Sequence, residues 1–143
     1  MTRWQELATT SHYQTAVAVR EALRSGKLQE AAQGIEELID ALSRSERRAL
    51  ESYLVRLMQH IIQWQCQPTN RSRSWQNTIA NARDAMAEIQ EDTPSLTDDV
   101  IRRLWDRALR KAQREAESDT DQMLPRLSLT WDDVFTAEYT LDT

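Results

Sequence analysis

Glycine and proline are nearly absent from this chain, which has two Gly and three Pro among 143 residues. These residues are the usual material of β-turns and of glycine-rich phosphate loops, so a multi-stranded sheet or a nucleotide-binding loop has little to be built from. The length suits one domain that carries its own hydrophobic core. We therefore expect residues 1–143 to fold as a single helical domain.

Apolar side chains recur along the chain at helical spacing. The clearest run spans 28–42, where apolar residues follow the i, i+3, i+4 pattern of an amphipathic helix. The other predicted helices cover 11–24, the stretch from Ser43 or Ser45 to about 65, the stretch from Ser72 or Ser74 to about 91, and the stretch from Ser95 or Thr97 to about 116. The helix that is predicted to end near 65 has the broadest apolar arc, so we expect it to be the most buried of the set.

Both ends of the chain carry further apolar residues. Those near Trp4 either form a separate first turn or extend the helix at 11–24. Those around Trp131, Val134 and Phe135 predict a short final turn, while Pro68 and Pro94 end the helices that precede them. The predicted fold class is all-α, a single-domain bundle of about five helices with a short C-terminal helical turn.

Charge, cysteine content and hydropathy limit the binding partners and the cellular location that we expect for the protein. The 18 basic and 23 acidic residues give a net charge of −5, which opposes the approach of nucleic acid. The one cysteine excludes an internal disulfide and any zinc site built from several cysteines. The N-terminus lacks a secretory signal, and no apolar run approaches the roughly 20 residues that cross a bilayer. We expect a cytoplasmic protein that binds neither nucleic acid nor membrane.

Motifs of known catalytic chemistry are missing from the sequence, including phosphate-binding loops, nucleophile elbows and metal-binding His-Glu pairs. His60 and Cys66 are the one pair that suggests metal or thiol chemistry. Six positions apart on one helix, they point about 120° away from each other. The sequence predicts a hydrogen-bonded structural His60 and an inert Cys66 thiol, with no catalytic residue, metal or cofactor. A site assembled across several helices stays open as the alternative.

The turn at 66–75 is the most distinctive segment. Arg71 and Arg73 lie at the start of a predicted helix, between two tryptophans, and such a helix N-terminus suits an anion or a carboxylate. In the alternative interpretation the tryptophans anchor the core, the serines cap the helix and the arginines pair with acids of the bundle. We favour this alternative because capping accounts for the serines without a ligand.

Four arginines recur in the last long helix at spacings of four, three and four: Arg103, Arg107, Arg110 and Arg114. They form one basic line opposite the apolar stripe of the same helix. Asp99 and Asp106 each precede one of these arginines by four residues, which predicts ion pairs with Arg103 and Arg110. No aromatic residue interleaves the arginines to stack on bases. The line is predicted to be a solvated face or a dock for the acidic surface of a protein partner.

Several segments, taken in order, resemble the family called domain of unknown function 29. They are 45–52, HIIQWQCQP at 60–68, RSRSW at 71–75, Arg83 and 93–96. The resemblance covers nearly the whole chain and implies an α-helical fold and a cyanobacterial source, but no activity. The chain departs from the family pattern at Ser11, Thr15 and Cys66 and at 128–131, so a site shared through those positions would be lost here.

These observations together predict a non-enzymatic protein-interaction module. Its partner would be an unknown protein or a second copy of the chain, and 16 of its 18 basic residues are Arg, which pairs with carboxylates through a planar fork. The alternative is a small-anion or nucleotide-binding protein, or a hydrolytic enzyme, that uses Arg71, Arg73 and His60.

Overall fold

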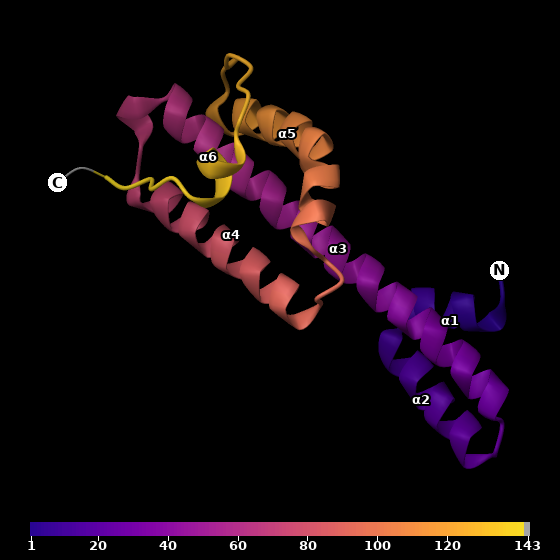
Figure 1. The fold of residues 1–143 in the computed structure, drawn as a ribbon. Coiled ribbons are helices and arrows are strands. Elements are labelled where there is room, and N and C mark those ends of the chain that lie inside the picture. The colour runs from indigo at the N-terminus through magenta and orange to yellow at the C-terminus, as the bar shows by residue number, and fades with distance from the viewer. Residues whose placement is uncertain (142–143) are drawn as a thin grey trace. The chain divides into compact units, whose positions relative to one another are not determined.

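The computed structural model describes residues 1–141, and in that range it holds six α-helices, one 3-10 turn and no strand (Figure 1). The elements are α1 (Arg3–Thr10), α2 (His12–Arg24), α3 (Leu28–Cys66), η1 (Pro68–Asn70), α4 (Arg73–Asp92), α5 (Asp98–Thr120) and α6 (Trp131–Phe135). Five helices have eight or more residues and α6 has five. The predicted all-α class with a short C-terminal helix is therefore confirmed.

The chain divides into two compact units, Met1–Arg47 and Arg48–Thr143, and α3 contributes residues to both. The single-domain organisation stays a prediction. None of the helices among residues 1–141 combines the length and the apolar character that crossing a bilayer requires.

The predicted break at Ser43 or Ser45 is wrong, because α3 continues through both residues. A serine caps a new helix only where the preceding one stops, and no Gly or Pro stands nearby to stop it. Ser11 does separate α1 from α2, which settles the question left open by the sequence. Its backbone is extended, with φ −157°, and its side chain accepts a hydrogen bond from the Gln14 N–H at 3.1 Å.

The first unit packs α1 and α2 against the small residues of α3. Its buried apolar cluster consists of Trp4, Val19, Ala22 and Ala31. Gly34 is essential to this packing, since a Cβ at this position would lie 2.7 Å from atoms of both Trp4 and Val19. Four of the five large residues of the run at 28–42 lie on another face of α3 and are exposed: Leu28, Ile35, Ile39 and Leu42. The fifth, Leu38, is half-buried.

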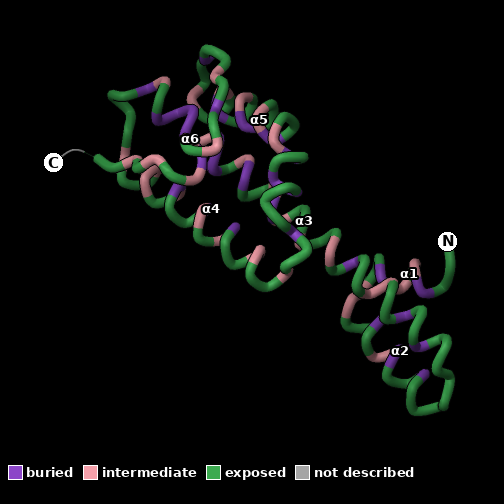
Figure 2. The backbone as a smooth tube through the Cα atoms, viewed as in Figure 1, coloured by how far each residue is buried: buried purple, intermediate pink, exposed green. Residues whose placement is uncertain are grey.

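The second unit surrounds the C-terminal half of α3, which is its most buried helix segment, as the broad apolar arc predicts (Figure 2). Leu50, Leu54, Leu57, Met58, Ile61 and Ile62 have no exposed surface. The neighbouring helices complete this core with Ile79 and Met86 from α4, a row from Ile101 to Ala116 on α5, and Val134 from α6.

Candidate functional site

The second unit carries a groove between α3 and α5 with a volume of about 600 Å³. Four of its lining residues are basic and two are acidic, so the groove has a local positive excess in a chain of net charge −5. The lining residues are Arg48, Glu51, Ser52, Val55, Arg56, Gln59, Lys111, Arg114 and Glu115.

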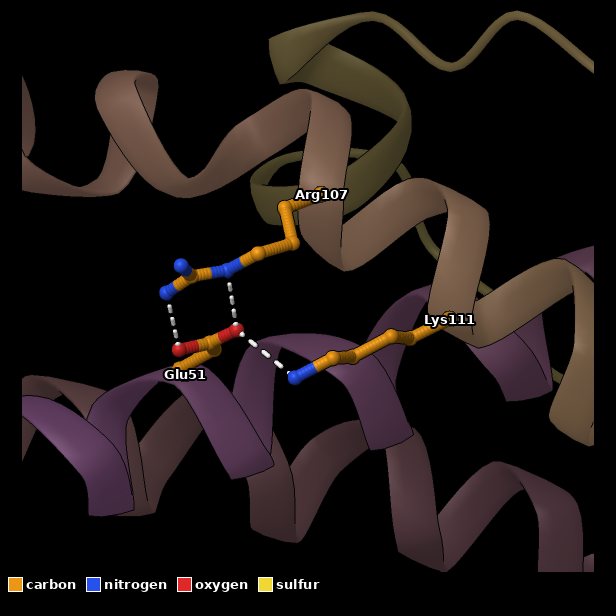
Figure 3. Close-up of polar contacts among 3 residues, drawn as sticks. All are labelled: Glu51, Arg107 and Lys111. Carbon is orange, nitrogen blue, oxygen red and sulfur yellow. Dashed lines mark hydrogen bonds and ion pairs between the residues drawn. The ribbon is translucent and has the colours of Figure 1, made fainter.

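Glu51 holds the two walls of this groove together (Figure 3). The Arg107 fork donates to both of its carboxylate oxygens, at 2.8 and 2.6 Å, and Lys111 Nζ donates at 3.2 Å. The Glu51 side chain is only 13% exposed. The hydrogen bond from Arg107 lowers the pKa of Glu51 below its usual value, with Lys111 adding to the effect against the opposing cost of burial. The carboxylate is therefore already neutralised by these two cations.

A second hollow of about 440 Å³ lies between α5 and the segment that follows it. It is lined by Arg110, Gln113, Arg114, Glu117, Met123, Leu124, Arg126 and Leu127. Arg114 lines both hollows, which makes them neighbours across α5. Glu117 is already engaged, because its Oε2 accepts a hydrogen bond from the Leu124 N–H at 2.9 Å.

The guanidinium groups around these hollows are largely without partners. Among residues 1–141, no ion pair or side-chain hydrogen bond involves the guanidinium groups of Arg48, Arg56, Arg110, Arg114 and Arg126. A guanidinium presents a planar fork of N–H donors that matches a carboxylate or a phosphate. The surface is therefore supplied with free donors for an anionic group.

The predicted arginine line on α5 is exposed along its whole length. Arg107 is bound to Glu51, and Arg110 and Arg114 line the hollows, whereas Arg103 lines neither. The predicted ion pairs are wrong. Asp99 pairs with Arg102 at 3.0 Å instead of Arg103, since residues three apart also face each other on a helix, and no ion pair of Asp106 occurs within the described part of the chain.

Arg71, Arg73 and His60 are not brought together in either hollow. Arg71 Nε donates to the Trp64 carbonyl at 2.8 Å, and its guanidinium lies 5.1 Å from the centre of the Trp64 ring. His60 Nδ1 lies 2.9 Å from the Arg56 carbonyl oxygen, as expected for a hydrogen-bonded structural histidine. Arg73 is exposed at the first residue of α4.

The capping interpretation of this turn is confirmed at Ser72, whose Oγ accepts from the Trp75 N–H at 3.2 Å. The predicted pairing of Arg71 and Arg73 with acids of the bundle is wrong, because neither forms an ion pair among residues 1–141. Trp75 itself is half-buried and packs against the core of the second unit. Burial raises the pKa of the Cys66 thiol, which disfavours the reactive thiolate and agrees with the inert thiol that the sequence predicts.

Contacts among Arg83, Tyr139 and Trp64 hold the segment after α6 against the rest of the second unit. Arg83 Nε donates to the Val134 carbonyl at 2.8 Å, and its guanidinium lies 5.6 Å from the Tyr139 ring. Tyr139 in turn meets Trp64 edge to face, with ring centres 6.1 Å apart. Burial lowers the pKa of Arg83 and raises that of Tyr139. No sequence motif predicts these contacts, which join residues about 50 to 75 positions apart.

Beyond the groove, hydrogen-bonded glutamine side chains follow one another toward the C-terminal end of α3. Gln59, which lines the groove, donates to Gln63 Oε1 at 3.0 Å, and Gln63 donates to Asp119 Oδ2 at 3.0 Å. Gln67 donates to Gln122 Oε1 at 2.8 Å. Gln63 has no exposed surface, and its amide is paired on both sides. The amides therefore tie the end of α3 to the end of α5.

The described residues contain no group of three or more His, Cys, Asp or Glu side chains placed to hold a metal ion. No curated protein and no solved structure matches the chain. The pattern of the family described as Domain of unknown function DUF29 matches residues 10–140, so the chain belongs to this family.

Proposed function

We propose that this member of the DUF29 family is a non-enzymatic protein-interaction module whose basic face on α5 binds an acidic segment of a protein partner. The observation that carries the proposal is the set of arginines around the two hollows whose guanidinium groups have no partner within residues 1–141. Carboxylates on a partner would supply the missing acceptors through charge-assisted, bidentate hydrogen bonds.

The acids of this face support a partner that is protein rather than nucleic acid. Glu115 and Glu117 lie among the arginines and would repel a continuous line of phosphates. The two hollows have no aromatic lining residue on which a base could stack. The second hollow also offers Met123, Leu124 and Leu127, which suit apolar side chains of an acidic peptide.

The alternative, an anion-binding or hydrolytic site at Arg71, Arg73 and His60, has less support. Two of the three side chains are engaged with backbone carbonyls, Arg71 with Trp64 and His60 with Arg56. Cytoplasmic location and a cyanobacterial source stay predictions from the sequence.

Fluorescence anisotropy with a labelled peptide that alternates Glu or Asp with Leu tests the proposal at about 50 mM salt, where screening is weak. We expect saturable binding that Arg114→Glu weakens by about tenfold or more, because Arg114 lines both hollows. Arg103→Glu is the matched control. It reverses the same charge on the same helix, but Arg103 lines neither hollow, so affinity should stay within about twofold.

Three results would overturn this function. They are the absence of peptide binding, equal losses in the Arg114 and Arg103 variants, and tighter binding of duplex DNA or single-stranded RNA than of the acidic peptide. Binding of inorganic phosphate that is lost in an Arg73→Gln variant, but not in Arg114→Glu, would favour the alternative site.

A further inference from the structure

The second hollow has both a charged and an apolar lining. Of the described residues that line the first groove, only Val55 is apolar. The second hollow instead sets three apolar side chains beside three arginines: Met123, Leu124 and Leu127 beside Arg110, Arg114 and Arg126. The guanidinium groups of these arginines have no partner among residues 1–141. Glu117 is the one acid of the lining, so the hollow keeps a positive excess.

Hydrogen bonds to Leu124 fix the wall of this hollow. The Leu124 N–H donates to Glu117 Oε2 at 2.9 Å, and the Leu124 carbonyl accepts from Gln113 Nε2 at 3.1 Å. Gln113 and Glu117 lie about one turn apart on α5, so both anchors come from the same face of one helix. The Leu124 side chain is itself buried in the core of the second unit. A ligand therefore meets a wall that is already formed and loses little affinity to ordering it.

Met123 and Leu127 are the apolar side chains of the hollow that a ligand can cover. Met123 is 90% exposed, and Leu127 is half-buried. A methionine side chain is unbranched and flexible, so it adapts to the shape of an apolar group laid against it. Removing this apolar surface from water favours binding of such a group.

We propose that the second hollow binds a small amphipathic anion, a molecule with one anionic head and a short apolar tail. The head accepts hydrogen bonds from the guanidinium forks, which match a carboxylate or a phosphate, while the tail lies against Met123 and Leu127. The volume of about 440 Å³ falls within the range of small-molecule sites, about 300–1,000 Å³. This inference goes beyond the proposed acidic partner, because it rests on the lining of the second hollow alone.

Two-dimensional NMR of the isotope-labelled full chain, titrated with sodium octanoate, tests the proposal. We expect saturable shifts that are largest at the amides of 110–117 and 123–127, with a dissociation constant of about 1 mM or below. Octanamide keeps the tail without the charge, and acetate keeps the charge without the tail. Each should bind at least about tenfold more weakly than octanoate. A parallel titration with octyl phosphate identifies the preferred head group, which is that of the tighter ligand.

Two matched double variants locate the site. Arg110→Gln with Arg126→Gln should weaken octanoate binding by about tenfold or more, because both residues line the second hollow. Arg48→Gln with Arg56→Gln removes the same charge from residues that line only the first groove, so the dissociation constant should stay within about twofold. All four side chains are exposed, and a thermal melt followed by circular dichroism checks that both variants fold.

Three results would overturn the inference. They are the absence of binding by both octanoate and octyl phosphate, binding of octanamide or acetate as tight as that of octanoate, and equal losses in the two double variants. Binding of the acidic peptide without binding of either amphipathic anion would overturn this inference and leave the proposed function standing. Octanoate binding without peptide binding would overturn the proposed function and leave this inference standing.

Discussion

Arg107 and Glu51 lie 56 positions apart in sequence, yet Nε and Nη2 of Arg107 each donate to a different carboxylate oxygen of Glu51, at 2.8 and 2.6 Å. Both ends of the pair come from regular helix, α5 and α3, so their separation is fixed by helix packing rather than by a loop. The ion pair neutralises the negative charge that Glu51 would otherwise contribute to the groove. Glu51 therefore does not offset the positive charge of the unpaired arginines beside it.

Replacing Glu51 by Gln should make the free energy of unfolding depend less on pH in the acidic range. The pKa of Glu51 in the folded protein is lowered from 4.5, so its contribution is present above that pH and is lost as the pH falls through the lower folded value. We expect Glu51→Gln to lower the free energy of unfolding by about 1 kcal/mol at pH 7, a modest amount because both partner cations are solvent-exposed. Urea unfolding at several pH values measures the difference, which should shrink steadily below pH 4.5.

Glu88→Gln provides the control for this series, because Glu88 is exposed and forms no ion pair within residues 1–141. Its difference from wild type should stay within about 0.5 kcal/mol at each pH. A Glu51→Gln difference that is constant with pH would contradict the assigned role of the ion pair.

Gly34→Ala should destabilise the first unit, although alanine is the better helix former by about 1 kcal/mol. The added Cβ would lie 2.7 Å from atoms of Trp4 and Val19, and overpacking of this kind costs about 1–3 kcal/mol. Thermal melts followed by Trp fluorescence and by circular dichroism measure the loss. Gln33→Ala, on the exposed side of the same helix, should change stability by less than about 0.5 kcal/mol. Equal stability of the two variants would mean that Trp4 does not pack on α3.

Arg71→Ala and Arg73→Ala should differ, although the residues are two positions apart. Arg71 donates to the last turn of α3 and lies over the Trp64 ring, so its loss should cost about 1–2 kcal/mol. Arg73 is exposed, and no ion pair or side-chain hydrogen bond of its guanidinium is seen in residues 1–141, so its loss should cost less than about 0.5 kcal/mol. Denaturant midpoints of the two variants make the comparison. Indistinguishable midpoints would contradict a stabilising role for the contacts of Arg71 with Trp64.

Arg83→Lys should loosen the segment around Tyr139 while leaving the helices intact. Arg83 donates to the Val134 carbonyl through Nε and to the Asp133 carbonyl through Nη2, and a lysine cannot reproduce this fork. Hydrogen exchange of the amides at 134–139 should accelerate by about tenfold, with exchange in α4 and α5 unchanged. Arg73→Lys serves as the control. Uniform acceleration across the protein would indicate global destabilisation instead.

The sequence predicts the helices far better than it predicts the contacts between them. Periodicity, Pro68 and the Ser72 cap locate the helices of the second unit, because each acts over a few residues. The break assigned at Ser43 or Ser45 fails because a serine permits a helix start without forcing one. Periodicity also leaves undecided which apolar residues of 28–42 are covered, because that depends on where α1 docks.

At the candidate site, too, the sequence predicts local features but not the contacts between helices. Exposure of the arginine line follows from helical spacing alone and is predicted correctly. The role of Glu51 is missed, because nothing local distinguishes it from other helical glutamates before α5 is placed beside α3. The same holds for Arg83, whose acceptors lie about fifty residues further along the chain.

The buried amide of Gln63 has a consequence for how the second unit can rearrange. It pairs with Asp119 while Gln67 pairs with Gln122, so two rungs of hydrogen bonds join the same two chain segments. Sliding α5 along α3 by one turn, about 5.4 Å, would move both acceptors out of reach and leave the NH2 group of Gln63 without an acceptor in the core. An apolar seam would tolerate such a slip, whereas these rungs admit a single alignment. The spacing between the arginines of α5 and those of α3 is therefore set at the far end of the groove, by groups that no partner needs to touch.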